Sequence, residues 1–325
     1  MEADGKLVWT YKHALTPSKM PKNLLVMGSG AIGVEFASFY NTLGANTTIV
    51  EVRDRILPVE DEEISSFAAE HFTKQGMTIK TGTKVQKLDR KKDRVIASIN
   101  CNGVMEEFEF DVVISAIGIV GNVEDLGLEE VGVETKSGHV VTNEYCETNI
   151  PGIFAIGDLT GTPWLAHKAS HEGALVAEKV AGIRVQPLNP IAIPGCTYSY
   201  PQIASVGLTE AQAKEVGYKI NVGKFPFKGN GKALALGEKD GFVKTIFDSN
   251  SGELLGAHMI GAEVTELIQG YVIGQALETT EEDLAHTIFP HPTLSEMMHE
   301  SVLDAYNRVI PVSYTHLTLP TNREV

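Results

Sequence analysis

Two stretches of the chain contain residues whose types and spacing can do chemistry. The first is a glycine-rich turn, GSGAIG from Gly28 to Gly33, between the apolar run LLVM and an apolar helix pattern. In such a turn Gly28 permits the tight bend, Gly30 lets the backbone approach a pyrophosphate, and Gly33 lets helix and strand pack closely. The N-terminus of the following helix offers free N–H groups and a positive dipole end to phosphates. The spacing therefore predicts a dinucleotide site.

The acid that such a site needs is also present. Residues 46–50 are expected to form a strand, and Glu51 stands at its end, at the offset typical of the carboxylate that binds the ribose. A carboxylate there repels a 2′-phosphate, which favours NAD over NADP. Arg53 and Arg55 follow closely and could bind a 2′-phosphate, so NADP stays open. An ordinary strand with a surface glutamate is the competing interpretation, but strand, turn, helix and acid together favour dinucleotide binding.

The second stretch is FPHPTLSE, from Phe289 to Glu296. His291 lies between two prolines just before a predicted helix, and Glu296 lies in the first turn of that helix, within reach of an imidazole nitrogen. A histidine held by a carboxylate is a good general base. However, Thr293 and Glu296 also fit a Thr-x-x-Glu capping box, and the residues alone favour this structural interpretation.

The glycine turn requires a sheet with a helix packed on it. The apolar residues that recur at helical spacing are expected to form the packed face of that helix: Ile32, Phe36, Tyr40 and Leu43. A helix is expected over 61–74 and a third strand over 77–79. Alternation over 85–110 predicts a β-meander, and residues 112–118 read as a buried parallel strand that ends in Gly118.

The second half of the chain changes character. An apolar strand is expected to end in Gly157 and Asp158, with a helix over 165–181. Asp158 either binds a ligand at the strand's carboxyl end or starts a turn, and the pattern favours neither interpretation over the other. From residue 189, short strands alternate with helices, which predicts an α+β domain with an antiparallel sheet and a last helix over 294–309.

Composition excludes several function classes. The 325 residues carry a net charge of −15, which disfavours nucleic acid and anionic membranes as partners. Cys101, Cys146 and Cys196 lie far apart, so no disulfide framework, zinc site or redox pair is indicated, and no metal is expected. No signal peptide or long apolar span is seen, so a soluble, cytoplasmic protein is expected.

With these residues in place, the chain resembles the pyridine nucleotide–disulfide oxidoreductases and, among them, the dihydrolipoyl dehydrogenase group. The resemblance covers residues 6–310. The stretches that carry it are GSGAIGVE at 28–35, AIGD at 155–158, LAHKASHEG at 165–173 and HPTLSE at 291–296. The third separates this group from glutathione reductase-like relatives, which share the HPT…E ending.

The resemblance implies roles for single residues. Proteins of this family pass an electron pair from dihydrolipoamide to a cysteine pair, then to FAD, then to NAD⁺. His291 would be the base that deprotonates the dithiol, Glu296 would orient it, and the capping geometry can coexist. Asp158 would bond the ribityl chain of FAD. The cofactor-binding residues expected are Gly28, Gly30, Ala31, Ile32, Gly33, Glu35, Glu51, Gly118, Gly157, Asp158 and Ala166.

The resemblance also implies partners. The family forms homodimers in which His291 would complete the active site of the partner subunit. Its substrate is carried on a lipoyl domain of a 2-oxo acid dehydrogenase complex. The expected division is a remnant or linker at 1–21, an NAD-binding domain at 22–148, a remnant of the FAD-binding domain at 149–187, an α+β dimerisation domain at 188–311 and a non-native-looking tail at 312–325.

This sequence departs from the family at two places. The family's first domain holds FAD and carries a CxxxxC redox pair, and neither feature is present here. The sequence GIVGN from Gly118 replaces the more usual Gly-Arg-x-Pro-Asn. We therefore expect weak NAD(H) binding, no tight FAD binding and no lipoamide dehydrogenase activity by this chain alone. Alternatives are a non-catalytic NAD-binding and dimerisation module, or a glutathione reductase-like disulfide reductase.

Overall fold

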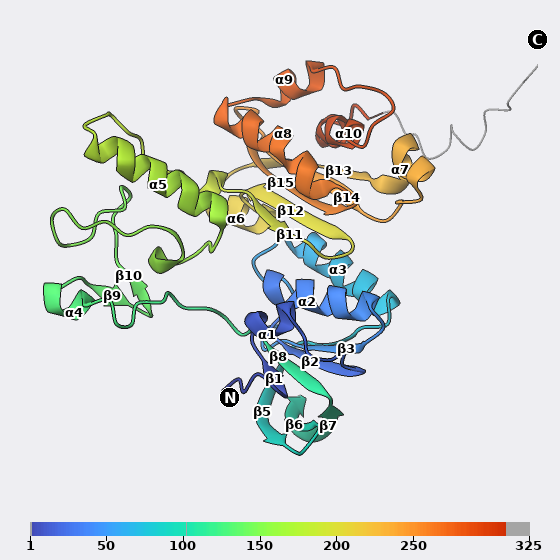
Figure 1. Cartoon of the computed structure of the whole chain (residues 1–325). Helices are drawn as coiled ribbons and strands as arrows, with labels where there is room; N and C mark the ends of the chain where they lie inside the picture. The colour runs from blue at the N-terminus through green and yellow to red at the C-terminus, as the bar shows by residue number, and fades with distance from the viewer. Residues whose placement is uncertain (1, 102, 310–325) are drawn as a thin grey trace, which may run out of the picture. The chain divides into compact units, whose positions relative to one another are not determined.

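The computed structural model describes residues 2–101 and 103–309 (Figure 1). The chain divides into two compact units. The described parts of Met1–Ile117 and Cys196–Val325 form the larger unit, and Gly118–Gly195 form the smaller one. The tail predicted at 312–325 lies outside the described residues.

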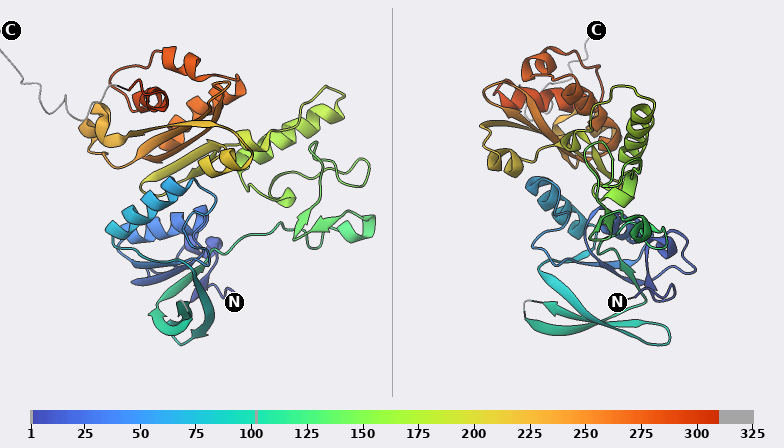
Figure 2. Two further views of the ribbon diagram at one scale, coloured as in Figure 1. Left: turned by 180° about the vertical axis from the view of Figure 1, so that it is seen from behind. Right: turned by 90° about the vertical axis from the view of Figure 1, so that its left-hand side faces the viewer.

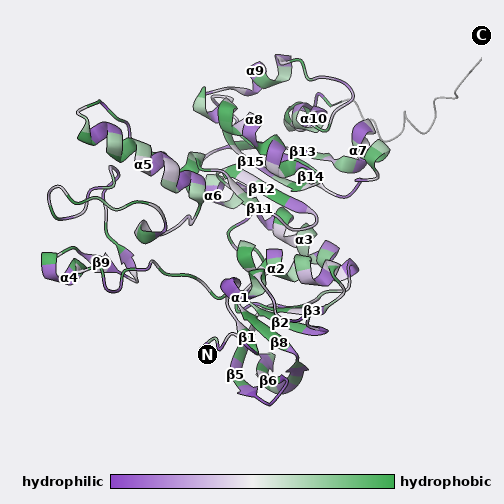
Figure 3. Ribbon diagram, viewed as in Figure 1, coloured by the Kyte–Doolittle hydropathy of each residue, from purple (hydrophilic) through white to green (hydrophobic). Residues whose placement is uncertain are grey.

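The larger unit begins with a parallel sheet in the strand order β1-β8-β2-β3-β4. Its strands β2 and β8 are mostly apolar and buried, as expected for parallel strands covered on both faces (Figure 3). Alternate residues serve opposite faces: Leu24 and Val26 pack under helices α2 and α3, while Leu25 and Met27 pack on a β-meander. The elements are β2 Asn23–Met27, α2 Ala31–Thr42, β3 Asn46–Val50, α3 Glu62–Lys74, β4 Thr78–Lys80 and β8 Val112–Ser115.

The predicted meander is present. It covers the sheet face opposite to α2 and α3 (Figure 2), where Val95, Ala97 and Ile99 are fully buried. Its antiparallel strands pair in sequence order, with a bulge between Val85 and Lys87. The strands are β5 Thr83–Arg90, β6 Val95–Cys101 and β7 Val104–Phe110.

Part of the segment expected to be a linker at 1–21 instead belongs to the folded unit. Strand β1, Val8–Trp9, pairs in parallel with β8, and helix α1, Tyr11–Leu15, follows it. Trp9 is 1% exposed and joins the core under α2. A two-residue strand that pairs with residues about 100 positions away leaves no periodic signal, which explains the difference.

The packed face of α2 also differs from the prediction. Ile32 is 38% and Leu43 is 57% exposed, whereas the buried residues are Gly33, Val34, Ala37, Ser38 and Tyr40. The cause is the turn: a Cβ on Gly33 would lie 2.1 Å from the Gly28 carbonyl oxygen. Small side chains therefore face the sheet near the turn, and Ile32 and Leu43 point outward. Tyr40 is buried and Phe36 is half-buried against the same core, as predicted.

The larger unit ends in an antiparallel sheet in the order β11-β12-β15-β14-β13. Every residue of β14 and β15 is buried. Helices α8 and α10 cover one face, and residues such as Phe242 and Ile260 on the other face join the core around α3. The predicted α+β domain is thus confirmed. The strands are β11 Gly195–Thr197, β12 Gln202–Gly207, β13 Ile220–Pro226, β14 Phe242–Asp248 and β15 Leu254–Gly261; the helices are α6 Glu210–Glu215, α7 Gly231–Leu236, α8 Val264–Ala276, α9 Glu281–His286 and α10 Glu296–Ala305.

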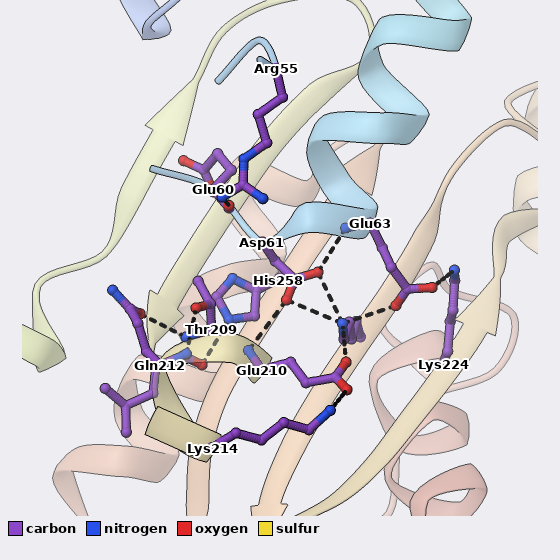
Figure 4. Close-up of polar contacts among 12 residues, drawn as sticks. Arg55, Glu60, Asp61, Glu63, Thr209, Glu210, Gln212, Lys214, Lys224 and His258 are labelled. Carbon is purple, nitrogen blue, oxygen red and sulfur yellow. Dashed lines mark hydrogen bonds and ion pairs between the residues drawn. The ribbon is translucent and has the colours of Figure 1, made fainter. Parts of the chain in front are cut away.

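A group of charged side chains joins α3 to this sheet (Figure 4). It is here called the seam cluster and consists of Asp61, Glu63, Glu210 and Lys244. Lys244 on β14 is 1% exposed, and its ammonium lies 2.9 Å from Asp61, 2.9 Å from Glu63 and 2.7 Å from Glu210. Asp61 caps α3 by accepting the N–H of Glu63, and it also accepts the N–H of Glu210 at 3.3 Å. Each charge is therefore paired, as buried charges must be.

The smaller unit contains little regular structure. The strand predicted before Gly157 is not formed; Phe154 makes only an isolated bridge to Glu147, and Gly157–Thr160 is a 3-10 turn, η1. An extended segment becomes a strand only beside a partner, and this unit supplies only short ones. Residues 118–148 group with this unit rather than with the parallel sheet. Its elements are α4 Leu128–Val131, β9 Thr135–Lys136, β10 His139–Val140, α5 Ala166–Val180 and η2 Pro190–Ala192.

The described residues contain neither a membrane-spanning helix nor a metal-binding cluster. No helix there is long and apolar enough to cross a membrane. Within the same residues, no group of three or more His, Cys, Asp or Glu side chains is placed to hold a metal ion.

Candidate functional site

The glycine turn has the geometry of a phosphate-binding turn. Gly28 has φ of +97°, and a Cβ there would lie 2.4 Å from the Ala116 carbonyl oxygen. Packing thus requires glycine at positions 28 and 33. Gly30 differs, because nothing lies within 4 Å of its Cβ position. Gly30 is the N-cap of α2 and has no side chain that could cap the helix. The open space therefore lies at a helix end that is able to bind an anion.

Glu51 ties this turn to the end of β3. It is 7% exposed, and its Oε2 accepts the N–H of Ser29 at 3.0 Å and the Ser29 hydroxyl at 2.7 Å. Its Oε1 accepts the N–H of Arg53 at 2.9 Å. A carboxylate has about four acceptor positions and three are used here, so about one remains for a ribose hydroxyl. The contribution of Ser29 is not predictable from the turn motif, whose pattern leaves this position free.

Glu35, which is expected to bind the cofactor, contacts the protein backbone instead. Its carboxylate accepts the N–H of Tyr198 at 2.8 Å, and Ser38 on the same helix accepts the N–H of Tyr200. Burial raises the pKa of Glu35, and the Tyr198 N–H only partly offsets it. Glu35 therefore links α2 to the chain entering the antiparallel sheet; that it also lines an NAD site stays a prediction.

The remaining predicted cofactor residues lie in the smaller unit. Gly118 has φ of +123° with open space at its Cβ position, and Ala166 is the first residue of α5. Gly157 is buried with φ of +72°, while Asp158, next to it, is exposed. An exposed carboxylate on a fixed turn suits a hydroxyl-bearing ligand such as a ribityl chain. Ala31 and Ile32 form the first turn of α2.

His291 and Glu296 are in contact, as predicted. The Nδ1 of His291 lies 2.8 Å from Glu296 Oε1, and the His291 side chain is 77% exposed. The other oxygen, Oε2, accepts the N–H of Thr293 at 2.9 Å. One carboxylate therefore serves both the imidazole and the helix start, so the two interpretations of this stretch coexist. Because a carboxylate oxygen can only accept, Nδ1 is the donor in this contact, and Nε2 is not engaged by Glu296.

Two of the three cysteines, Cys146 and Cys196, are poor nucleophiles. All three are free thiols. Burial raises the pKa of Cys146, and burial also raises the pKa of Cys196, with nearby carboxylates adding to both effects. A thiol with a raised pKa is mostly protonated at neutral pH and reacts slowly.

Comparison with known proteins agrees with this geometry. Residues 2–173 match the family model described as pyridine nucleotide-disulphide oxidoreductase, and residues 193–302 match the dimerisation domain of that family. The chain belongs to the pyridine nucleotide-disulphide oxidoreductase family. This finding supports the parallel-sheet domain and the antiparallel domain as the family's nucleotide-binding and dimerisation parts.

Within this family, the chain is similar to several proteins named dihydrolipoyl dehydrogenase. The chain is 56% identical over 312 residues to dihydrolipoyl dehydrogenase of Rhizobium etli, which covers 95% of this chain and 65% of that protein. It is 54% identical to dihydrolipoyl dehydrogenase of Zymomonas mobilis, with 95% and 67% covered. The crystal structure of LpdA from Mycobacterium tuberculosis superposes with a TM-score of 0.86 at 26% identity, over 93% of this chain and 65% of that one. The chain thus spans about two thirds of the length of its relatives.

Proposed function

We propose that this chain carries the NAD-binding and acid–base parts of a dihydrolipoyl dehydrogenase. The observation that carries the proposal is the His291–Glu296 pair. Its 2.8 Å contact fixes Nδ1 on the carboxylate and leaves Nε2 exposed to accept a thiol proton. Named relatives at 54–56% identity favour this reaction over that of a glutathione reductase.

Two cofactors are part of the proposal. Gly28–Gly33 and Glu51 would hold NAD(H), and the open space at Gly30 fits a pyrophosphate. Asp158 fits a ribityl hydroxyl of FAD, which when bound would supply the two-electron relay between dithiol and NAD⁺. The chain does not supply the cysteine pair that would accept electrons from the dithiol, because its three cysteines lack the spacing of such a pair: Cys101, Cys146 and Cys196.

A second copy of the chain is the partner that the site indicates. Within the described residues, Glu296 is the side chain that hydrogen-bonds His291, and the His291 side chain is 77% exposed. A base so exposed lacks the enclosed surroundings of an active site, and residues 193–302 match a dimerisation domain. We infer a homodimer acting on lipoyl domains of a 2-oxo acid dehydrogenase complex.

Titration of this chain with NADH and NADPH tests the nucleotide half of the proposal. Arg55 donates to the backbone carbonyl of Pro58, which leaves it less available for a 2′-phosphate, so NADH should bind more tightly. Glu51→Ala should weaken NADH binding roughly tenfold and remove the preference over NADPH, because it deletes the ribose acceptor.

Ser29→Ala is the matched control for this titration. It removes one bond to Glu51 and keeps the carboxylate, so NADH affinity should stay within about twofold. Equal losses in the two variants would mean that Glu51 acts by supporting the turn. Absence of NADH binding to the unsubstituted chain would refute the nucleotide site.

A further inference from the structure

The turn that presents Asp158 is held by a buried ion pair on helix α5. Lys168 and Glu172 are 7% and 8% exposed and lie one helical turn apart, with Nζ and Oε1 separated by 3.3 Å. Neither residue is accounted for by the proposed function. Lysine and glutamate side chains are rarely this buried unless they are paired.

Both side chains also form hydrogen bonds with η1 and the residue that follows it. Glu172 accepts the N–H of Gly157 at 2.6 Å. Lys168 donates to the Gly157 carbonyl at 3.2 Å, the Thr160 hydroxyl at 3.0 Å and the Gly161 carbonyl at 3.1 Å. The ammonium thus uses its three hydrogens on the two ends of η1, and the carboxylate fixes the amide that precedes Asp158.

The consequence is a rigid backbone beneath an exposed acid. Gly157 has φ of +72° and a Cβ there would lie 3.2 Å from Ala169, so the turn is pressed against α5 at this point. Asp158 itself belongs to no ion pair among the described residues and is exposed. The clamp, defined as Lys168 and Glu172, therefore fixes where the Asp158 carboxylate stands without touching it.

We propose that Lys168 and Glu172 are positioning residues for Asp158, which they hold in place for a ribityl hydroxyl of the flavin. The proposal rests on the proposed function, which assigns Asp158 to FAD. It adds that the affinity for flavin depends on a lysine and a glutamate that do not contact it.

Amide hydrogen exchange on this chain tests the clamp. Lys168→Met and Glu172→Gln should speed exchange over residues 157–161 at least roughly tenfold, because the backbone bonds are lost or weakened. Lys168→Arg, which keeps the charge and donors, should restore much of the protection. Glu178→Gln, on an exposed position of the same helix, is the control and should change nothing. Unchanged exchange in Lys168→Met, or equal acceleration throughout the chain, would overturn the clamp.

Flavin affinity tests the link to the ligand. A chimaera joins this chain to the third of the Rhizobium etli relative that lies outside the match, and flavin fluorescence gives the dissociation constant for FAD. Lys168→Met should raise that constant roughly tenfold. Combined with Asp158→Asn it should add nothing further, because it acts through Asp158.

The outcomes separate the two proposals. Full additivity of Lys168→Met and Asp158→Asn, or no effect of Lys168→Met on FAD affinity, would overturn the positioning role while leaving the proposed function intact. An unsubstituted chimaera that binds NADH but no FAD would overturn the assignment of Asp158 and this inference together, even if the exchange data upheld the clamp.

Discussion

Replacing Lys244 with methionine is expected to destabilise the larger unit by about 3 kcal/mol at neutral pH, since removing one member of a buried ion pair strands its partner. The stranded charge is Asp61, which is 2% exposed. Glu63 and Glu210 are 45% and 31% exposed and can turn to water, so they contribute less. Urea unfolding of this chain and the Lys244→Met variant measures the difference.

The size of this effect should depend on pH. Burial alone would lower the pKa of Lys244, but its hydrogen bonds to Glu210, Glu63 and Asp61 outweigh burial and raise it. Despite burial, Lys244 lowers the pKa of Asp61, and Lys224 and Lys244 lower that of Glu63. Lys214 and Lys244 lower the pKa of Glu210. The carboxylates stabilise the fold above their unfolded pKa values, and this is lost as pH falls through the lowered folded values. Lysine's contribution is complete below its unfolded pKa and is lost only in strong alkali.

The stability difference should therefore be largest between about pH 5 and pH 10 and shrink in acid. Lys224→Met is the matched control, because Lys224 bonds Glu63 at 2.7 Å but is 41% exposed; it should cost no more than about 1 kcal/mol. Asp61→Asn combined with Lys244→Met should recover part of the loss, since no buried charge is then left unpaired. A Lys244→Met variant as stable as the parent would show that the seam cluster contributes nothing.

Replacing His291 with glutamine should have the largest effect on activity. In the chimaera, the rate of NAD⁺ reduction by dihydrolipoamide should fall about 10²- to 10⁴-fold, the range that general-base catalysis contributes. Glutamine cannot take the thiol proton that Nε2 would accept. Glu296→Gln should cost less, because an amide oxygen can still orient Nδ1 but cannot stabilise the imidazolium by charge.

His286→Gln provides the control for this substitution. His286 is an exposed histidine at the end of α9, five positions before His291. Its loss should leave the rate of NAD⁺ reduction unchanged. Rates that fall equally in the His286 and His291 variants would show that the region is merely sensitive to substitution, and a full rate in His291→Gln would exclude the imidazole as the base.

Local signals in the sequence predict the parts of the fold that local contacts determine. The helix expected over 61–74 forms over Glu62–Lys74, with Asp61 as its N-cap. The turn at Gly28–Gly33 and the pair His291–Glu296 each lie within six residues, so spacing places their members within reach of one another. For Glu296 the residues alone favour the capping interpretation, and the resemblance to the family favours the contact with His291. The alternation that predicts the meander is likewise a property of neighbouring residues.

The features that sequence reasoning missed depend on distant residues. The apolar residues of α2 lie on more than one face, and the close approach at Gly33 decides which face packs. Lys244 stands in a mostly apolar strand, and its partner Asp61 lies 183 positions away. Trp9 belongs to a strand that exists only because β8 pairs with it. Such positions carry no periodic signal of their own.

The most direct test of the account is the reduction of NAD⁺ by dihydrolipoamide in the flavin-loaded chimaera. The account predicts turnover with this pair of substrates and little with glutathione disulfide and NADPH. A chimaera that binds FAD yet reduces only glutathione disulfide, or that shows no turnover with either pair, would contradict it.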